Sequence, residues 1–161
     1  MPNNKSINIL GIDPGYDRLG IAIVAQDIHG KDTVVHSECF TTNKNADIHE
    51  RLRAIGERIE KIFEDYVVDA VAMETLFITK NQKTAMRVAE ARGIIIYEAA
   101  KRHIPVFEYS PMQIKTAITS DGTSDKTRMI KMVHMLVNVP PKKLDDEYDA
   151  IAVALTHSAV R

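Results

Sequence analysis

The sequence predicts an α/β fold: a five-stranded mixed sheet, with three antiparallel strands followed by two parallel ones, flanked by helices. The first observation is a series of three strand-length apolar segments joined by short polar links, which is typical of an antiparallel meander. The second is the alternation of helical and strand-like segments that follows. We find no internal repeat, low-complexity segment or linker, so residues 1–161 are predicted to form a single domain.

The meander occupies the beginning of the chain. Residues 6–13 are predicted to form a strand, and the sequence Asp13-Pro14-Gly15-Tyr16-Asp17 that follows is typical of a tight turn. Residues 20–24 and 33–40 supply the other two strands. Residues 47–66 then place apolar side chains at helical spacing, which predicts an amphipathic helix.

Two short strands and four helices are predicted in the remainder. Residues 70–74 lack a polar face, as expected of a central strand that is covered on both sides. The strand over residues 105–109 begins with a proline, which strand starts tolerate. Capping residues and prolines delimit the helices. These helices are expected over residues 82–102, from Ser110-Pro111 onward, from Thr123-Ser124-Asp125-Lys126 to about 138, and over 144–158.

The composition indicates an ordinary globular protein. Hydrophobic residues make up 45% and charged residues 27% of the chain. The polar N-terminus does not resemble a signal peptide, and no apolar stretch approaches the roughly 20 residues that cross a bilayer. The single cysteine, Cys39, cannot form an internal disulfide and is expected to be an inert strand residue. We therefore expect a cytoplasmic location and no membrane contact.

The net charge leaves the binding partner open. It is −1, whereas a protein that grips nucleic acid is expected to carry a basic surface. However, an acidic catalytic cluster would subtract from a basic patch elsewhere, so the overall balance neither supports nor excludes nucleic acid.

Four acidic residues stand where metal ions would be held. Asp13 and Glu74 each end an apolar strand, and Asp146 and Asp149 lie one helical turn apart. A carboxylate at the end of a buried strand is costly unless its charge is compensated. Oxygen ligands of this kind suit Mg²⁺ or Mn²⁺. The pattern predicts a metal-dependent phosphodiesterase.

Simpler explanations exist for each acid taken alone. Asp13 could merely start a turn through a side-chain hydrogen bond, and its Gly-Ile-Asp-Pro-Gly context also resembles a phosphate loop of actin-like ATPases, which need a second large domain. Acids in the first turn of the last helix are favoured by its dipole. That helix is almost entirely apolar after Asp149, so Asp146 and Asp149 are expected to face a site, and Asp145 and Glu147 to face solvent. Gly20, without a side chain, would let a substrate or ion approach.

An aromatic residue and two lysines complete the candidate site. Phe77 lies in a predicted loop close to the cations Lys80, Lys83 and Arg87, an arrangement that can stack on an unpaired base, although a loop phenylalanine more commonly folds back onto the core. Lys115 and Lys126 flank a glycine-containing turn that could hold a phosphate; the simpler explanation is a solvated surface position.

At this stage the chain resembles the RuvC-type Holliday junction resolvases, which have a ribonuclease-H-like fold. The resemblance extends over nearly the whole chain, and it is specific because several short motifs occur in order. These are Ile9-Leu10-Gly11-Ile12-Asp13-Pro14-Gly15, Met73-Glu74-Thr75-Leu76-Phe77, Ala89-Glu90-Ala91-Arg92-Gly93, Val106-Phe107-Glu108-Tyr109 and Asp146-Glu147-Tyr148-Asp149-Ala150.

The resemblance implies an endodeoxyribonuclease of homologous recombination and DNA repair. Asp13, Glu74, Asp146 and Asp149 would be its metal-binding tetrad. By the same resemblance Phe77 would stack on a base, while Lys115 and Lys126 would lie near the scissile phosphate, with Lys126 also offsetting charge in the transition state. The family acts as a homodimer that cuts two symmetric strands of a four-way junction, and a branch-migration motor is a possible partner.

The implied mechanism uses two Mg²⁺ ions, about 4 Å apart, and leaves 5′-phosphates; Mn²⁺ is expected to substitute.

One departure from the family is Ser120, which stands at a glycine position of the loop before Lys126 and predicts a stiffer loop. Two alternatives stay open: a ribosomal-RNA-processing nuclease of the same fold, which shares the Gly-Ile-Asp-Pro-Gly opening, and a junction-binding subunit without catalysis.

Overall fold

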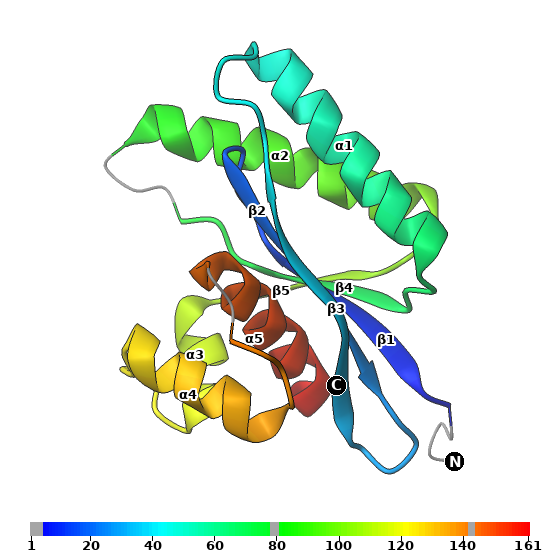
Figure 1. Cartoon of the computed structure of the whole chain (residues 1–161), viewed down its shortest axis with the longest axis vertical. Coiled ribbons are helices and arrows are strands. Elements are labelled where there is room, and N and C mark those ends of the chain that lie inside the picture. Colours follow the sequence, from blue (N-terminus) through cyan, green and yellow to red (C-terminus); the bar gives the residue numbers. More distant parts are fainter. Residues whose placement is uncertain (1–4, 78–80, 142–143) are drawn as a thin grey trace.

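The computed structural model describes residues 5–77, 81–141 and 144–161. Its centre is a mixed sheet with the strand order β3-β2-β1-β4-β5, in which β1, β2 and β3 are antiparallel and β4 and β5 run parallel to β1 (Figure 1). The strands are β1 (Ile7–Asp13), β2 (Arg18–Gln26), β3 (Asp32–Thr41), β4 (Ala70–Glu74) and β5 (Val106–Tyr109). The predicted fold class is confirmed.

Helices cover both faces of the sheet. Figure 1 shows α1 and α2 together on one face, with α3, α4 and α5 on the other. Their bounds are α1 (Ile48–Asp65), α2 (Gln82–Lys101), α3 (Pro111–Thr119), α4 (Lys126–Leu136) and α5 (Asp145–Val160). Within the described ranges, no helix combines the length and apolar character that crossing a bilayer requires.

Strand alternation divides the apolar side chains between two cores. Leu10 and Ile12 of β1 pack towards α1 and α2, whereas Ile9 packs towards α3, α4 and α5. Successive side chains of a strand point to opposite faces, so a sheet covered by helices on both sides needs apolar residues at consecutive positions. This is why the predicted strands read as unbroken apolar runs.

Two glycines allow α5 to lie directly on the middle of the sheet. A Cβ atom on Gly11 would stand 2.1 Å from the carbonyl oxygen of Ala150, and one on Gly20 would stand 2.1 Å from that of Asp146. The expectation that Gly20 admits a substrate or ion is therefore wrong, because the backbone of α5 occupies the space. The close approach instead sets the first turn of α5 beside the end of β1.

The parallel pairing of β1 and β4 places two of the predicted acids side by side. Ile12 is opposite Met73, so Asp13 and Glu74 follow at neighbouring strand ends. Asp13 is also opposite Gly20, over which Asp146 lies. One edge of the sheet thus collects acids from β1, β4 and α5. The division of the chain into one domain stays a prediction.

Candidate active site

The four predicted acids meet at the end of the sheet where β1 and β4 stop. The charges of Asp149, Asp146 and Glu74 all raise the pKa of the Asp13 carboxyl group, so the four groups interact electrostatically. They come from three separate elements that are far apart in sequence.

Asp13 has the most perturbed carboxyl group of the cluster. Burial is the largest cause and the three neighbouring carboxylates add to it, and together they raise its pKa to about 7. The ammonium group of Lys126 acts in the opposite direction but does not compensate. At neutral pH this group therefore lies close to its titration midpoint.

Glu74 and Asp149 are perturbed in the same direction. Burial and the charge of Asp149 raise the pKa of Glu74 against the opposing charges of Lys126, Lys115 and Arg92. Burial likewise raises the pKa of Asp149, although the hydrogen bond from Lys126 lowers it. The cluster as a whole is short of positive charge.

Cations hold the two acids of α5. Lys126, the first residue of α4, donates a hydrogen bond to Asp149, and the Nε of Arg18 lies 3.4 Å from a carboxylate oxygen of Asp146. Among the residues that the structure describes, no three histidine, cysteine or carboxylate side chains are gathered closely enough to hold a metal ion. These two ion pairs are a physical reason why the carboxylates stay apart, since each pair draws one carboxylate towards a cation.

Three adjoining hollows follow this edge of the sheet. One of about 310 Å³ is lined by Glu74, Asp149, Lys115 and Lys126. A second, of about 230 Å³, shares Glu74 and adds Asp13 and Phe77. The third, of about 250 Å³, shares Asp13 and includes Arg18 and Asp146. Every predicted site residue therefore lines this continuous series.

Phe77 does not fold back onto the core. Its side chain is 57% exposed and lies beside the acidic edge, which leaves an aromatic face available to a ligand. Lys83 and Arg87 follow on α2, while Lys80 lies outside the described residues. Lys115 is half-buried in α3, where its charge acts on Glu74.

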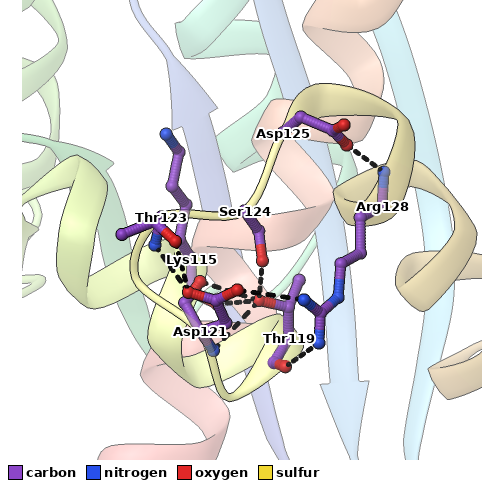
Figure 2. A network of polar contacts seen from close by, with 7 residues as sticks. All are labelled: Lys115, Thr119, Asp121, Thr123, Ser124, Asp125 and Arg128. Carbon is purple, nitrogen blue, oxygen red and sulfur yellow. Dashed lines mark hydrogen bonds and ion pairs between the residues drawn. The ribbon is translucent and has the colours of Figure 1, made fainter.

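The loop before Lys126 is held by a dense polar network (Figure 2). Asp121 accepts hydrogen bonds from the backbone and hydroxyl of Thr123 and forms an ion pair with Arg128, with 3.0 Å between Nη1 and Oδ2. The hydroxyl groups of Thr119 and Ser124 are hydrogen-bonded to each other beneath it. Chiefly because of the Thr123 hydroxyl, the pKa of Asp121 is lowered, so its charge is retained and satisfied within the loop.

Ser120 adopts the left-handed conformation, with φ of 60°, at the C-terminus of α3. This is the backbone region that glycine occupies at little cost. Serine therefore occupies a backbone conformation that glycine adopts with less strain, and the greater stiffness of the loop stays a prediction.

Sequence reasoning missed two arginines and misplaced one acid. Arg18 and Arg92 contact Asp146 and the main chain of Glu74, respectively. Arg92 carries a usable signal, because it falls within the apolar stripe predicted for the helix over 82–102; Arg18 carries none that we can identify. Glu147 was expected to face solvent, but it accepts a hydrogen bond from Ser37 of β3.

His157 is not part of this edge. It is buried in the last turn of α5, where its Nδ1 lies 2.6 Å from the hydroxyl oxygen of Tyr109 and its ring lies 4.3 Å from that of Phe107. Burial lowers its pKa, which favours the neutral ring. It stabilises the contact between α5 and β5.

The donor set fits hard divalent cations. All four acids offer oxygen, which Mg²⁺ and Mn²⁺ prefer. The three neighbouring carboxylates, which add to the effect of burial in raising the pKa of Asp13, would favour added positive charge there. Incoming ions would compete with Lys126 for Asp149 and with Arg18 for Asp146.

Comparisons with known proteins agree with the sequence resemblance. The sequence profile of the family described as "Crossover junction endodeoxyribonuclease RuvC" matches residues 9–157. A protein of that name from Thermosipho melanesiensis is 40% identical over 149 residues, which are 92% of this chain and 94% of the relative. Another from Thermotoga maritima is 37% identical over 95% of this chain and 91% of its own length.

Solved structures give the same result. The Thermus thermophilus RuvC in complex with a Holliday junction substrate superimposes with a TM-score of 0.89 at 30% identity, covering 95% of this chain and 93% of that one. The yeast mitochondrial Holliday junction resolvase, at 15% identity and a TM-score of 0.71 over 95% of this chain and 78% of that one, shares the fold.

Proposed function

Because the chain belongs to the RuvC family of crossover junction endodeoxyribonucleases, we propose that it resolves four-way DNA junctions at the acidic edge of its sheet. The observation that carries this proposal is the meeting of four carboxylates from β1, β4 and α5 around Asp13. A site short of positive charge beside half-exposed lysines is suited to an anionic phosphodiester that arrives together with divalent cations.

The proposed metal ligands are Asp13, Glu74, Asp146 and Asp149, and the proposed cofactor is two Mg²⁺ ions, which Mn²⁺ can replace. Such ions would supply Lewis-acid chemistry, which activates water for attack on the phosphodiester and stabilises the departing 3′ oxygen, leaving a 5′-phosphate. Asp13 lines two of the hollows, one with Glu74 and the other with Asp146, so it would hold metal ions together with those acids.

Two lysines beside the acids would hold the scissile phosphate. Lys115 and Lys126 line the hollow that also contains Glu74 and Asp149. The ammonium group of Lys126, which donates a hydrogen bond to Asp149, would also serve a phosphate oxygen, where it would offset the charge of the transition state.

Phe77 would stack on a base that the junction leaves unpaired. Its exposed ring lies beside Asp13 and Glu74, so a base held there would bring its own phosphodiester to the acids. We further propose that the protein is a homodimer that makes paired symmetric nicks in recombination and repair. We also propose that it can work with a branch-migration motor and that it resides in the cytoplasm.

The direct test is a synthetic four-way junction incubated with the protein, with and without Mg²⁺. We expect paired incisions that require the metal. Asp13→Asn and Asp146→Asn should bind the junction and fail to cut it, whereas Asp145→Asn, an exposed neighbour in the same turn of α5, should cut near the wild-type rate. Unimpaired Mg²⁺-dependent nicking by both site variants would refute the assignment.

The same gel separates the alternatives. Preferential cleavage of a structured RNA in competition with the junction would favour the RNA-processing nuclease. Junction binding without any Mg²⁺-dependent or Mn²⁺-dependent incision would favour a non-catalytic subunit.

A further inference from the structure

Arg92 is a buried charge that the proposed chemistry does not use. It lies in the middle of α2, is only 7% exposed, and is followed by the buried Ile95 and Ala99 on the helix face that packs on the sheet. A guanidinium group in such a place is strongly destabilising unless its N–H groups are satisfied. Its partners therefore indicate why an arginine stands there.

The guanidinium group spans the ends of two neighbouring strands. Its Nη1 donates to the main-chain carbonyl oxygen of Glu74 at 2.5 Å, and its Nη2 forms an ion pair with the carboxylate of Glu108. Glu74 is the last residue of β4, and Glu108 belongs to the adjacent β5. The planar fork of an arginine presents its N–H groups to two such acceptors in a fixed geometry, which the single rotating ammonium group of a lysine does not provide.

The sheet itself has few donors for the end of β4. On the β1 side the chain continues from Asp13 into Pro14, which has no N–H group. On the β5 side the N–H group of Ser110 donates to the side chain of Gln113 at 2.8 Å, as part of the capping box of α3. Arg92 thus satisfies a carbonyl at the point where the strand ladder ends.

We propose that Arg92 is a positioning residue for the active site: it fixes the main chain at Glu74, and so holds the Glu74 carboxylate in the hollow that it shares with Asp13. Glu108 anchors the guanidinium group from the other strand. This inference rests on the proposed role of Glu74 as a metal ligand. Residues that orient metal ligands affect metal affinity by about tenfold to a hundredfold, and Arg92 is expected to have an effect of that size.

The test measures Mn²⁺ binding by isothermal titration calorimetry in the absence of DNA. Arg92→Gln should bind Mn²⁺ about ten times more weakly than the wild type, or worse. Arg102→Gln is a matched control at the C-cap of the same helix, about 15 Å further along its axis. Arg102 also donates to a main-chain carbonyl, that of Glu98 at 3.1 Å, and forms an ion pair with the Glu98 carboxylate. The Arg102→Gln substitution should therefore lower the melting temperature without changing the Mn²⁺ affinity.

A double-mutant cycle separates positioning from general loosening. If Arg92 acts through Glu74, the Arg92→Gln/Glu74→Gln protein should bind Mn²⁺ no more weakly than Glu74→Gln alone. Additive losses would overturn the inference. Arg92→Lys keeps the charge but not the fork, and should give an intermediate affinity; it also replaces Arg92→Gln if that variant does not fold.

Wild-type Mn²⁺ affinity in Arg92→Gln, or an equal loss of affinity in Arg102→Gln, would also overturn the inference. Junction cleavage by the wild type is scored separately. A wild type that binds Mn²⁺ but cuts no junction overturns the proposed function, and the comparison of the arginine variants still stands. A wild type that binds no Mn²⁺ at low-millimolar concentrations overturns both.

Discussion

Asp13 is the site acid whose ionisation is most strongly disfavoured, both by its burial and by the neighbouring carboxylates. Its carboxyl group ends the central strand among Glu74, Asp146 and Asp149, and the resulting pKa of about 7 lies far above the ordinary value of 3.8. The folded protein therefore binds a proton between these two values that the unfolded chain has already released. Stability must fall as the pH rises through that window.

Asp13→Asn should for this reason stabilise the metal-free protein at pH 8. The displaced pKa corresponds to at most about 4 kcal/mol, so an increase of several degrees in the melting temperature is expected, shrinking towards zero near pH 4. Thermal unfolding followed by circular dichroism in EDTA measures this difference. Added Mg²⁺ should raise the melting temperature of the wild type but not of Asp13→Asn, and equal melting temperatures at pH 8 would contradict the assignment.

Phe77→Ala should affect catalysis and leave the fold unchanged. The ring is 57% exposed, so its removal creates no cavity, and the melting temperature should stay that of the wild type. Loss of a base stack is worth about 1–3 kcal/mol, or about fivefold to 150-fold in cleavage rate. Single-turnover cleavage and gel-shift assays on one junction would show whether cleavage falls more than binding; an equal loss in both would not fit a stacking role at the reacting strand.

At the residue scale, the acids could be predicted and their cationic partners could not. Asp13 and Glu74 follow apolar strands, and this local pattern is visible in the sequence. Arg18 and Arg92 contact acids or carbonyls that are remote in the chain, so their roles appear only once β2 and α2 are placed. Even then, the structure lacks a preformed ligand set among the described residues, because cations hold the acids of α5.

At the scale of elements, α5 is what completes the site. It packs on β1 and β2 through Gly11 and Gly20, and this contact brings its first turn to Asp13. The predicted strands and helices agree with the structure to within a few residues, since alternation, capping residues and prolines are local signals. The role of Gly20 could not be predicted from the sequence, because the space beside a glycine can be filled by a helix backbone as readily as by a ligand.

Gly20→Ala should displace the start of α5. Its Cβ would stand 2.1 Å from the carbonyl oxygen of Asp146, a clash with backbone that no side-chain rotation relieves. We expect at least about a tenfold loss of Mn²⁺ affinity, which is the size of effect seen when residues that orient metal ligands are removed. The melting temperature should fall as well. Gly93→Ala in α2 is the control, because nothing lies within 4 Å of its added Cβ; it should keep Mn²⁺ affinity. Retained affinity in Gly20→Ala would mean that α5 does not set the site.

The loop before Lys126 is the second element whose conformation matters. Ser120→Gly should relieve the left-handed backbone and stabilise the protein by about 0.5–1 kcal/mol, or a few degrees in melting temperature. Because Asp121, Thr123 and Arg128 still hold the loop, Mn²⁺ affinity should not change. A lower melting temperature in differential scanning calorimetry would show that the serine makes a compensating contact.

At the scale of the whole molecule, the net charge is less informative than the places where the charged side chains lie. The net charge of −1 gives no indication of a nucleic-acid partner, and four of the 22 acidic residues lie together at one edge, beside Lys115 and Lys126. The convergence of remote segments at this edge could be anticipated only through the family resemblance, because no local pattern encodes distance in space.

The proposed homodimer has a candidate surface on α2. Met86 and Tyr97 are 64% and 63% exposed, and Met86 lines an apolar hollow of about 270 Å³ together with Leu76 and Ala89. Met86→Glu would place a charge in that surface, which is unfavourable in a buried interface. We expect a monomer by light scattering, with Mn²⁺ affinity unchanged because the acids lie on other elements, and single incisions replacing paired ones.

The control for this experiment is Met135→Glu in the last turn of α4, on the opposite face of the sheet and 70% exposed. It adds the same charge to an equally exposed methionine and should leave the dimer and the paired incisions intact. A dimeric Met86→Glu protein would move the interface away from this part of α2. A monomeric wild type at working concentration would instead remove the physical basis for paired cutting, because one acidic edge can act on only one strand at a time.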